Sequence, residues 1–151
     1  MKKKILLGAL ALTLTCSYGF ADDKDKGVSE RAKASFHHEF VNAEAVQWEN
    51  FGQFVKANFR MDGHILSAYF SPDGDLLAMT RNILSDQLPL HLLTMLKKEY
   101  PGYWITDLFE IYADEQTSYC ITLKNGDREV VLKSDAGGIW GVYRTKKEQT
   151  F

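Results

Sequence analysis

The same order of segments occurs twice along this chain, and it restricts the fold more than composition does. Each half begins with a stretch in which apolar residues recur every three or four positions, as on one face of a helix. Four runs rich in β-branched and aromatic residues follow each stretch, separated by turn signals that contain glycine. Two helix-plus-four-strand units in tandem are the simplest interpretation, and the predicted class is α+β.

The first unit is predicted over residues 28–83. Ala32, Phe36 and Phe40 share one face of a helix within residues 29–40. Strands are expected over residues 45–51, 53–61, 64–71 and 75–81.

The second unit is predicted over residues 84–145. A helix within residues 88–102 places four apolar residues on one face: Leu92, Met95, Leu96 and Tyr100. Pro89 suits a first helical turn, and Pro101-Gly102 ends the helix. Strands are expected over residues 103–113, 117–124, 128–134 and 138–144.

The turns of the two units also correspond. Asp62-Gly63 matches Asn125-Gly126, and both dipeptides favour the left-handed conformations of a two-residue hairpin. SPDGDLL at residues 71–77 aligns with SDAGGIW at 134–140. Pro72-Asp73-Gly74 is therefore predicted to be a hairpin turn with a left-handed glycine, and Asp135-Ala136-Gly137 its counterpart.

The first 21 residues differ from the rest. Three lysines precede an apolar run that is too short to span a bilayer, and small residues precede a cut after Ala21, which predicts a secretory signal peptide. Thr13 and Thr15 before Cys16 disfavour a lipoprotein signal. A flexible leader is expected over residues 22–27 and a C-terminal tail over 146–151, and the protein is expected to be periplasmic or secreted.

Charge and cysteine content limit the partners. Without the signal peptide the chain has 15 basic and 20 acidic residues, a balance of −5, and no cluster of cations interleaved with aromatics, so nucleic acid is not an expected partner. Cleavage would also leave Cys120 as the one cysteine, so no internal disulfide is expected.

Strand alternation separates two faces of the predicted sheet. If Asp62-Gly63 closes a two-residue turn, one face is uniformly apolar and must lie under the helices. The opposite face mixes aromatic, aliphatic and cationic residues, which suits protein recognition. Its predicted partner-binding residues are Phe54, Lys56, Asn58, Arg60, Ile65, Tyr69, Lys124 and Lys133. The alternative is a solvated sheet face that carries a few apolar residues.

The three tryptophans are predicted to be core residues. Trp140 and Val142 have the parity of Leu132 if Asp135-Ala136-Gly137 closes a three-residue loop. Trp48 and Trp104 lie close to helix ends, where packing against the core is expected.

Catalytic and metal sites have little support. No glycine-flanked nucleophile occurs, and the candidate acids Asp107, Glu110, Asp114 and Glu115 lie at strand ends, where exposed acids are common. The histidines lack zinc spacing, because adjacent His37 and His38 diverge by about 100° on a helix. Residues 71–82 lack the glycine and glutamate of a calcium loop. No cofactor, metal site or enzymatic activity is predicted.

The order of elements, the YPGYWI segment at residues 100–105 and the AYFSPDG hairpin at 68–74 resemble the PepSY-like family of secreted bacterial domains. That family is described as similar to β-lactamase inhibitor proteins. The resemblance covers residues 28 to about 145 and implies a curved eight-stranded antiparallel sheet with helices on one face. It also implies that the opposite, concave face binds a protein.

These observations predict a non-catalytic binding module. The leading hypothesis is that the face opposite the helices binds a protein or peptide, and that this binding inhibits an envelope or secreted hydrolase. The alternative is a small-ligand or ion-sensing envelope protein that uses the same face. The sequence leaves the identity of the partner and the oligomeric state open.

Overall fold

Helices and strands follow one another as the repeated pattern predicts. The computed structural model describes residues 26–135 and 138–147, so the predicted signal peptide at 1–21, Cys16, most of the predicted leader and residues 148–151 lie outside the described residues. The elements in chain order are α1 (Glu30–Glu39), β1 (Glu44–Asn50), β2 (Val55–Met61), β3 (His64–Phe70), β4 (Leu76–Asn82), the 3-10 turn η2 (Ser85–Gln87), α2 (Leu90–Glu99), β5 (Trp104–Ala113), β6 (Gln116–Lys124), β7 (Arg128–Ser134) and β8 (Trp140–Lys147).

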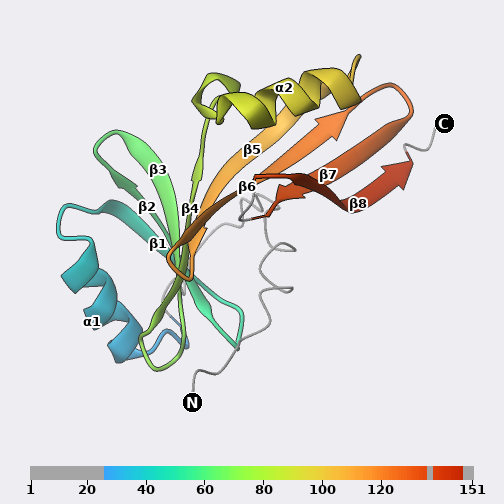
Figure 1. Cartoon of the computed structure of the whole chain (residues 1–151). Helices are drawn as coiled ribbons and strands as arrows, with labels where there is room; N and C mark the ends of the chain where they lie inside the picture. Colours follow the sequence, from blue (N-terminus) through green and yellow to red (C-terminus); the bar gives the residue numbers. More distant parts are fainter. Residues whose placement is uncertain (1–25, 136–137, 148–151) are drawn as a thin grey trace.

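The eight described strands form one antiparallel sheet in chain order from β1 to β8. This arrangement confirms the predicted α+β class. Figure 1 shows a curved sheet, with α1 along the half that contains β1 to β3 and α2 along the half that contains β5 to β8. The first two residues of the predicted tail, Lys146 and Lys147, belong to β8.

Helix α1 packs on the first half of the sheet through aromatic residues. Its Ala32 and Phe36 are fully buried, and Phe40 follows at the C-cap. The ring of Phe36 meets the rings of Phe59 and Trp48 edge-on, with centroids 5.0 and 5.3 Å apart. These edge-to-face contacts are the favoured aromatic geometry, so the predicted apolar stripe of this helix forms the first core.

Helix α2 packs on the second half of the sheet in the same way. Leu92 and Leu96 are buried, and Met95 and Tyr100 pack against them with partial exposure. The indole Nε1 of Trp140 in β8 donates a hydrogen bond to the carbonyl oxygen of Leu92, 3.0 Å away. Helix and last strand are thereby joined by a buried polar contact as well as by apolar packing.

Strand registers place both helices on one face of the sheet. Ala68 under α1 pairs with Met79, and Met79 pairs with Tyr112 in β5. Leu108 lies four residues from Tyr112 on the same strand, so it shares their face and packs under α2. A ten-residue helix is about 15 Å long, whereas eight strands span roughly 34 Å. Each helix therefore covers one half of this face, which we call the helix face.

The first hairpin has the predicted geometry. Met61 pairs with His64, and Asp62 and Gly63 both have positive φ, at 51° and 78°. The second prediction was wrong, because neither Asn125 nor Gly126 has positive φ. The Asn125 side chain instead accepts hydrogen bonds from the backbone N–H groups of Asp127 and Arg128, which is the local turn that asparagine side chains favour.

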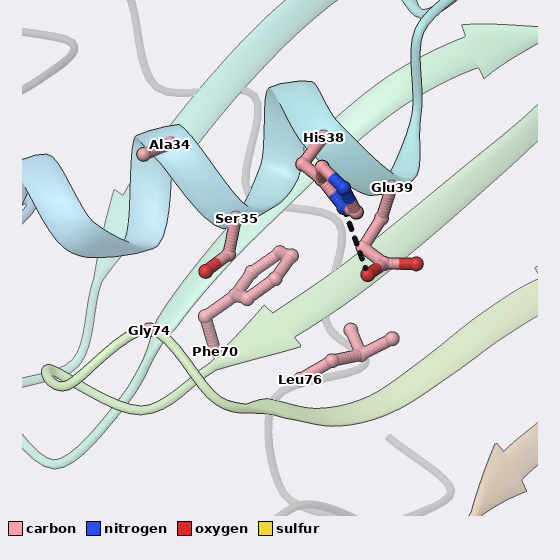
Figure 2. Close-up of a pocket in the computed structure, with 7 residues that line it drawn as sticks. All are labelled: Ala34, Ser35, His38, Glu39, Phe70, Gly74 and Leu76. Atoms are coloured by element: carbon pink, nitrogen blue, oxygen red, sulfur yellow. Dashed lines mark hydrogen bonds and ion pairs between the residues drawn. The ribbon is translucent and has the colours of Figure 1, made fainter.

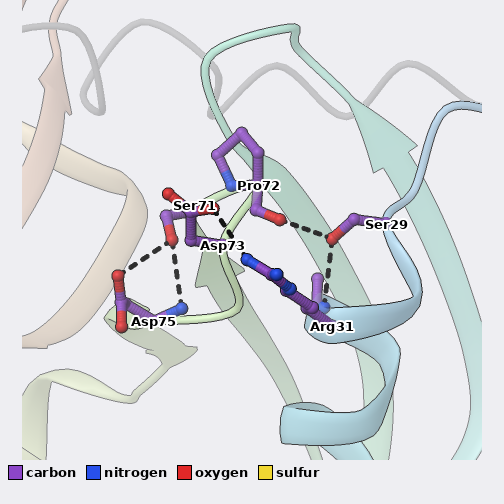
Figure 3. Close-up of polar contacts among 7 residues, drawn as sticks. Ser29, Arg31, Ser71, Pro72, Asp73 and Asp75 are labelled. Atoms are coloured by element: carbon purple, nitrogen blue, oxygen red, sulfur yellow. Dashed lines mark hydrogen bonds and ion pairs between the residues drawn. The ribbon is translucent and has the colours of Figure 1, made fainter.

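The loop between β3 and β4 joins the sheet to the start of α1. Gly74 has φ +94°, as predicted, and its N–H donates to the carbonyl of Ser71. Figure 3 shows the Ser29 hydroxyl group, which caps α1 by accepting from the Ala32 N–H and also donates to the carbonyl of Pro72 at 2.7 Å. One hydroxyl group thus fixes both the helix end and the turn.

The loop between β7 and β8 repeats this geometry with an offset of 64 residues rather than the predicted 63. Asp135 N–H donates to the Ile139 carbonyl and Gly138 N–H to the Asp135 carbonyl, as Ser71 does with Asp75 and Gly74 with Ser71. Gly138 has φ +75°, the left-handed conformation that was predicted for Gly137, and Gly137 itself lies outside the described residues.

Four residues were predicted to lie in the core, namely the three tryptophans and Val142. Two of these four predictions were wrong. Trp140 is buried, as predicted, and Trp48 packs against the first core with partial exposure. Trp104 is 54% exposed and Val142 is 63% exposed. Val142 has the predicted parity, since it pairs with Leu132, but it lies on the edge strand of the sheet.

Gly74→Ala is expected to destabilise the protein more than Gly102→Ala. Both glycines have positive φ, which costs a residue with a Cβ atom about 1–2 kcal/mol. A Cβ atom on Gly74 would lie 2.9 Å from the Arg31 carbonyl oxygen in α1, whereas nothing lies within 4 Å at Gly102. The overpacking adds about 1–3 kcal/mol to the cost at Gly74. Urea unfolding measures both, and equal losses would contradict the contact between this loop and α1.

Candidate functional site

No described helix covers the face of the sheet opposite the helix face, and we call it the open face. The residues predicted to bind a partner lie there: Lys56, Asn58 and Arg60 alternate with core residues along β2, and Ile65 and Tyr69 pair with Arg60 and Lys56 on β3. Lys124 pairs with Glu129, and Lys133 pairs with Cys120, in the second half. Phe54 precedes β2, and its ring lies 5.9 Å from that of Tyr69.

The polar residues in the first half of the open face bond to one another. The Glu49 carboxylate accepts a hydrogen bond from the Asn58 amide and lies 3.6 Å from the Lys56 ammonium group. The Ser67 hydroxyl group donates to the side-chain oxygen Oδ1 of Asn58 at 2.7 Å. Three neighbouring strands are thus linked by a network in which hydrogen-bonding groups satisfy one another.

An aromatic group lies beside this network. Phe51 stacks on Phe54, Phe54 contacts Tyr69, and the Lys56 ammonium group lies 6.0 Å above the Tyr69 ring. Tyr69 itself is buried, whereas Ile65 is 67% exposed. Of the residues predicted in this half, Arg60 and Ile65 are therefore the ones most available to a partner.

The second half of the open face is rich in cations. One cross-strand row contains Trp104, Lys124, Glu129 and Lys146, and the next contains Asp107, Thr122, Val131 and Arg144. The Glu129 carboxylate lies between Lys124 and Arg144, at 3.0 and 3.4 Å. We call Trp104, Lys124, Lys133, Arg144 and Lys146, with the carboxylates of Asp107 and Glu129, the basic patch.

Two side chains of the basic patch, Trp104 and Arg144, reach the open face because the strands that carry them have β-bulges, and neither was among the predicted partner-binding residues. The register shifts between Ile105 and Asp107 in β5, which turns Trp104 to the open face beside Lys124. It shifts again between Val131 and Leu132, so that Arg144 lies on the open face although it is four residues from buried Trp140. Plain alternation puts both side chains on the helix face.

The middle of the open face is apolar. Ile111, Cys120 and Val131 form a small buried cluster, and Phe109 packs against it. Burial raises the pKa of the Cys120 thiol, and the charge of nearby Lys133 only partly offsets this effect. A thiol that stays protonated is a poor nucleophile, so this residue has the environment of a packing residue.

A hollow of about 420 Å³ lies outside the open face, between α1 and the start of β4. Figure 2 shows that Ser35, His38 and Glu39 of the helix line it together with Leu76. His38 Nδ1 lies 3.4 Å from the Glu39 carboxylate, but the His38 side chain is 86% exposed. An exposed pair of neighbouring residues does not supply the fixed, desolvated polar groups of a small-ligand site.

The four candidate acids do not form one site. Asp107 lies on the open face, whereas Glu110 binds Arg81 on the helix face and raises the pKa of that guanidinium group. Burial, followed by the charge of Glu110, raises the pKa of neighbouring Tyr119. Asp114 and Glu115 form the turn between β5 and β6. Within the described residues, no group of three or more histidine, cysteine, aspartate or glutamate side chains could hold a metal ion.

Solved structures of bacterial proteins share this fold. A BLIP-like protein from Bacteroides fragilis matches with a TM-score of 0.66 and 21% identity, over 85% of this chain and 89% of its own. A DUF2874 family protein from Bacteroides ovatus matches with 0.69 and 17%, over 78% and 86%. A candidate periplasmic protein from Bacteroides eggerthii matches with 0.69 and 15%, over 85% and 90%.

These TM-scores show a common fold, which is the fold of the BLIP-like protein. No family model matches the chain, and no curated protein matches it. In the described part of the chain, no helix is both long and apolar enough to cross a membrane.

Glu129→Gln is expected to lower the free energy of unfolding by about 1–2 kcal/mol, because a partly buried carboxylate that bonds two cations is lost. The side chain of Glu129 is 16% exposed. Asp73→Asn is the matched control, since its pair with Arg31 joins side chains that are 80% and 74% exposed and should contribute little. Urea unfolding at low salt and at about 0.5 M NaCl separates them, because added salt screens charges. Equal effects of the two substitutions would contradict the bridging role of Glu129.

Proposed function

We propose that this chain is an exported, non-catalytic module whose open face binds another protein or a peptide. The observation that carries the proposal is the asymmetry of the sheet. One face is covered by two helices, while the other presents exposed Trp104, Ile65 and Arg60. Tryptophan and arginine are among the residues that concentrate binding energy at protein interfaces.

A merely solvated sheet face accounts less well for these residues. Antiparallel sheets often leave one face in water, and that face is then mostly polar. The open face instead has aromatic residues near one end, an apolar middle and an exposed tryptophan near the other end. Covering these apolar groups with a second surface removes them from water, which lowers the free energy and favours binding.

The structural neighbours support protein binding and export. One of them is called BLIP-like, a name that refers to β-lactamase inhibitor proteins, and another is a candidate periplasmic protein. We extend the proposal to inhibition of an envelope or secreted hydrolase. In this proposal the signal peptide at residues 1–21 directs export, and residues 28 to about 145 form the module of PepSY-like type.

The proposal also includes an internal duplication. The loops at Ser71–Asp75 and Asp135–Ile139 have equivalent hydrogen bonds, and each lies against the start of its own helix. A duplicated unit would explain why unrelated side chains, serine in one loop and aspartate in the other, accept from the backbone N–H four residues on.

Ile65→Asp is expected to abolish capture of a partner. Tagged full-length protein is crosslinked in its native envelope, and the adducts are measured by quantitative mass spectrometry. A charge on a desolvated contact weakens binding severely, so we expect at least a tenfold loss of the partner adduct.

Leu90→Asp on α2 is the matched control, because Leu90 is 78% exposed and lies on the other side of the molecule. Circular dichroism checks that both variants are folded. Adducts that persist in Ile65→Asp and in Arg60→Ala, or that disappear in Leu90→Asp, would overturn the proposal. A panel of secreted hydrolases, assayed with the pure protein, tests inhibition separately.

A further inference from the structure

The charge of the open face is distributed unevenly between its two halves. In the first half, two cations balance two carboxylates: Lys56 and Arg60 lie opposite Glu49 and Glu44 in the sheet register. In the second half, the basic patch has four cations and two carboxylates, a net charge of +2. The whole chain has a net charge of −2, so the basic patch opposes the overall charge.

The cations of the basic patch are only partly neutralised from within. Glu129 is shared between Lys124 and Arg144, so one carboxylate serves two cations. Asp107 accepts a hydrogen bond from the hydroxyl group of neighbouring Thr106. No acidic side chain of the described residues lies within ion-pair distance of Lys133 or Lys146. Within residues 26–135 and 138–147, Lys133 and Lys146 are thus two cations to which an external acidic group could bind.

The geometry of the patch suits a polypeptide. Its side chains come from four adjacent strands, β5 to β8, and form rows that run across these strands. Adjacent strands are about 4.8 Å apart, and this distance sets the spacing of the residues within a row. Trp104 lies at the end of one row and is 54% exposed, while Lys146 lies at the other end of the same row. An apolar anchor at one side and cations along the rest provide both burial and charge complementarity.

We propose that the basic patch docks an acidic segment of the protein partner, with Trp104 covering an apolar residue of that segment. This inference rests on the proposed function and specifies where on the open face the contact is made and what chemistry it recognises. Electrostatic attraction between such surfaces raises the association rate and falls with added salt.

A defined peptide tests the docking directly. The probe is a labelled ten-residue peptide of alternating glutamate and valine with one central phenylalanine, and binding to the exported protein is measured by fluorescence anisotropy. We expect binding that weakens at least tenfold from low salt to about 0.5 M NaCl, and at least tenfold in the double variant Lys133→Glu, Lys146→Glu. Trp104→Ala should also weaken binding of the peptide. Trp104→Phe keeps an aromatic ring at this position and should bind the peptide nearly as tightly as the unmodified protein does.

The matched control is Lys97→Glu, Lys98→Glu, which changes the net charge equally but on the exposed end of α2. Equal loss in the two double variants would assign the effect to net charge and overturn the inference. Absence of binding, or equal binding of a peptide with lysine in place of glutamate, would also overturn it. The comparison of the glutamate peptide with the lysine peptide uses the unmodified protein, so it tests the inference even where a variant fails to fold.

The result is separable from the test of the general function. If the envelope partner is captured and its adduct depends on Ile65 but not on Lys133 and Lys146, the binding module stands and the basic patch is not its contact. If the adduct is lost in the Lys133→Glu, Lys146→Glu variant and retained in the α2 control, both statements hold together.

Discussion

Alternation of side chains across tightly registered strands is the constraint on which the rest of the structure depends. The two-residue turn at Asp62-Gly63 fixes the pairing of β2 with β3, and a shift of one residue would exchange the two faces. With this register, Phe36 of α1 meets a continuous apolar surface, and the polar and aromatic residues of the same strands are all placed opposite. The core and the open face are therefore two results of one pairing.

The helices, the strands and the identity of the two faces could be predicted because they depend on periodicity. The β-bulges could not, because they arise where the backbone of a twisted sheet departs from regular pairing, and no residue type marks them reliably. Trp104, which was expected in the core, and Arg144, for which no face was predicted, both lie on the open face because of such bulges. The residues of the open face were thus predictable in its first half, where Tyr69 is nevertheless buried, and incomplete in its second.

Turns were predictable where glycine alone decides the geometry and unpredictable where side chains compete with the backbone. Asp62-Gly63 has the expected left-handed pair, whereas the Asn125 side chain holds its own loop by accepting two N–H groups. The same competition hid the true sequence offset between two loops with equivalent hydrogen bonds. Ser71 and Asp135 both cap the backbone four residues on, and the left-handed glycines follow them at equal distance as Gly74 and Gly138.

The two halves of the open face differ in what a partner would have to replace. In the first half, Glu49, Asn58 and Ser67 already bond to one another, so covering them gains few new polar contacts. In the second half, Lys133 and Lys146 have no acidic partner among the described residues, so a carboxylate of a partner can form a charge-assisted hydrogen bond with each of them. Recognition of a particular partner is therefore better supported by the second half, while the aromatic and aliphatic residues of the first half offer area with little discrimination.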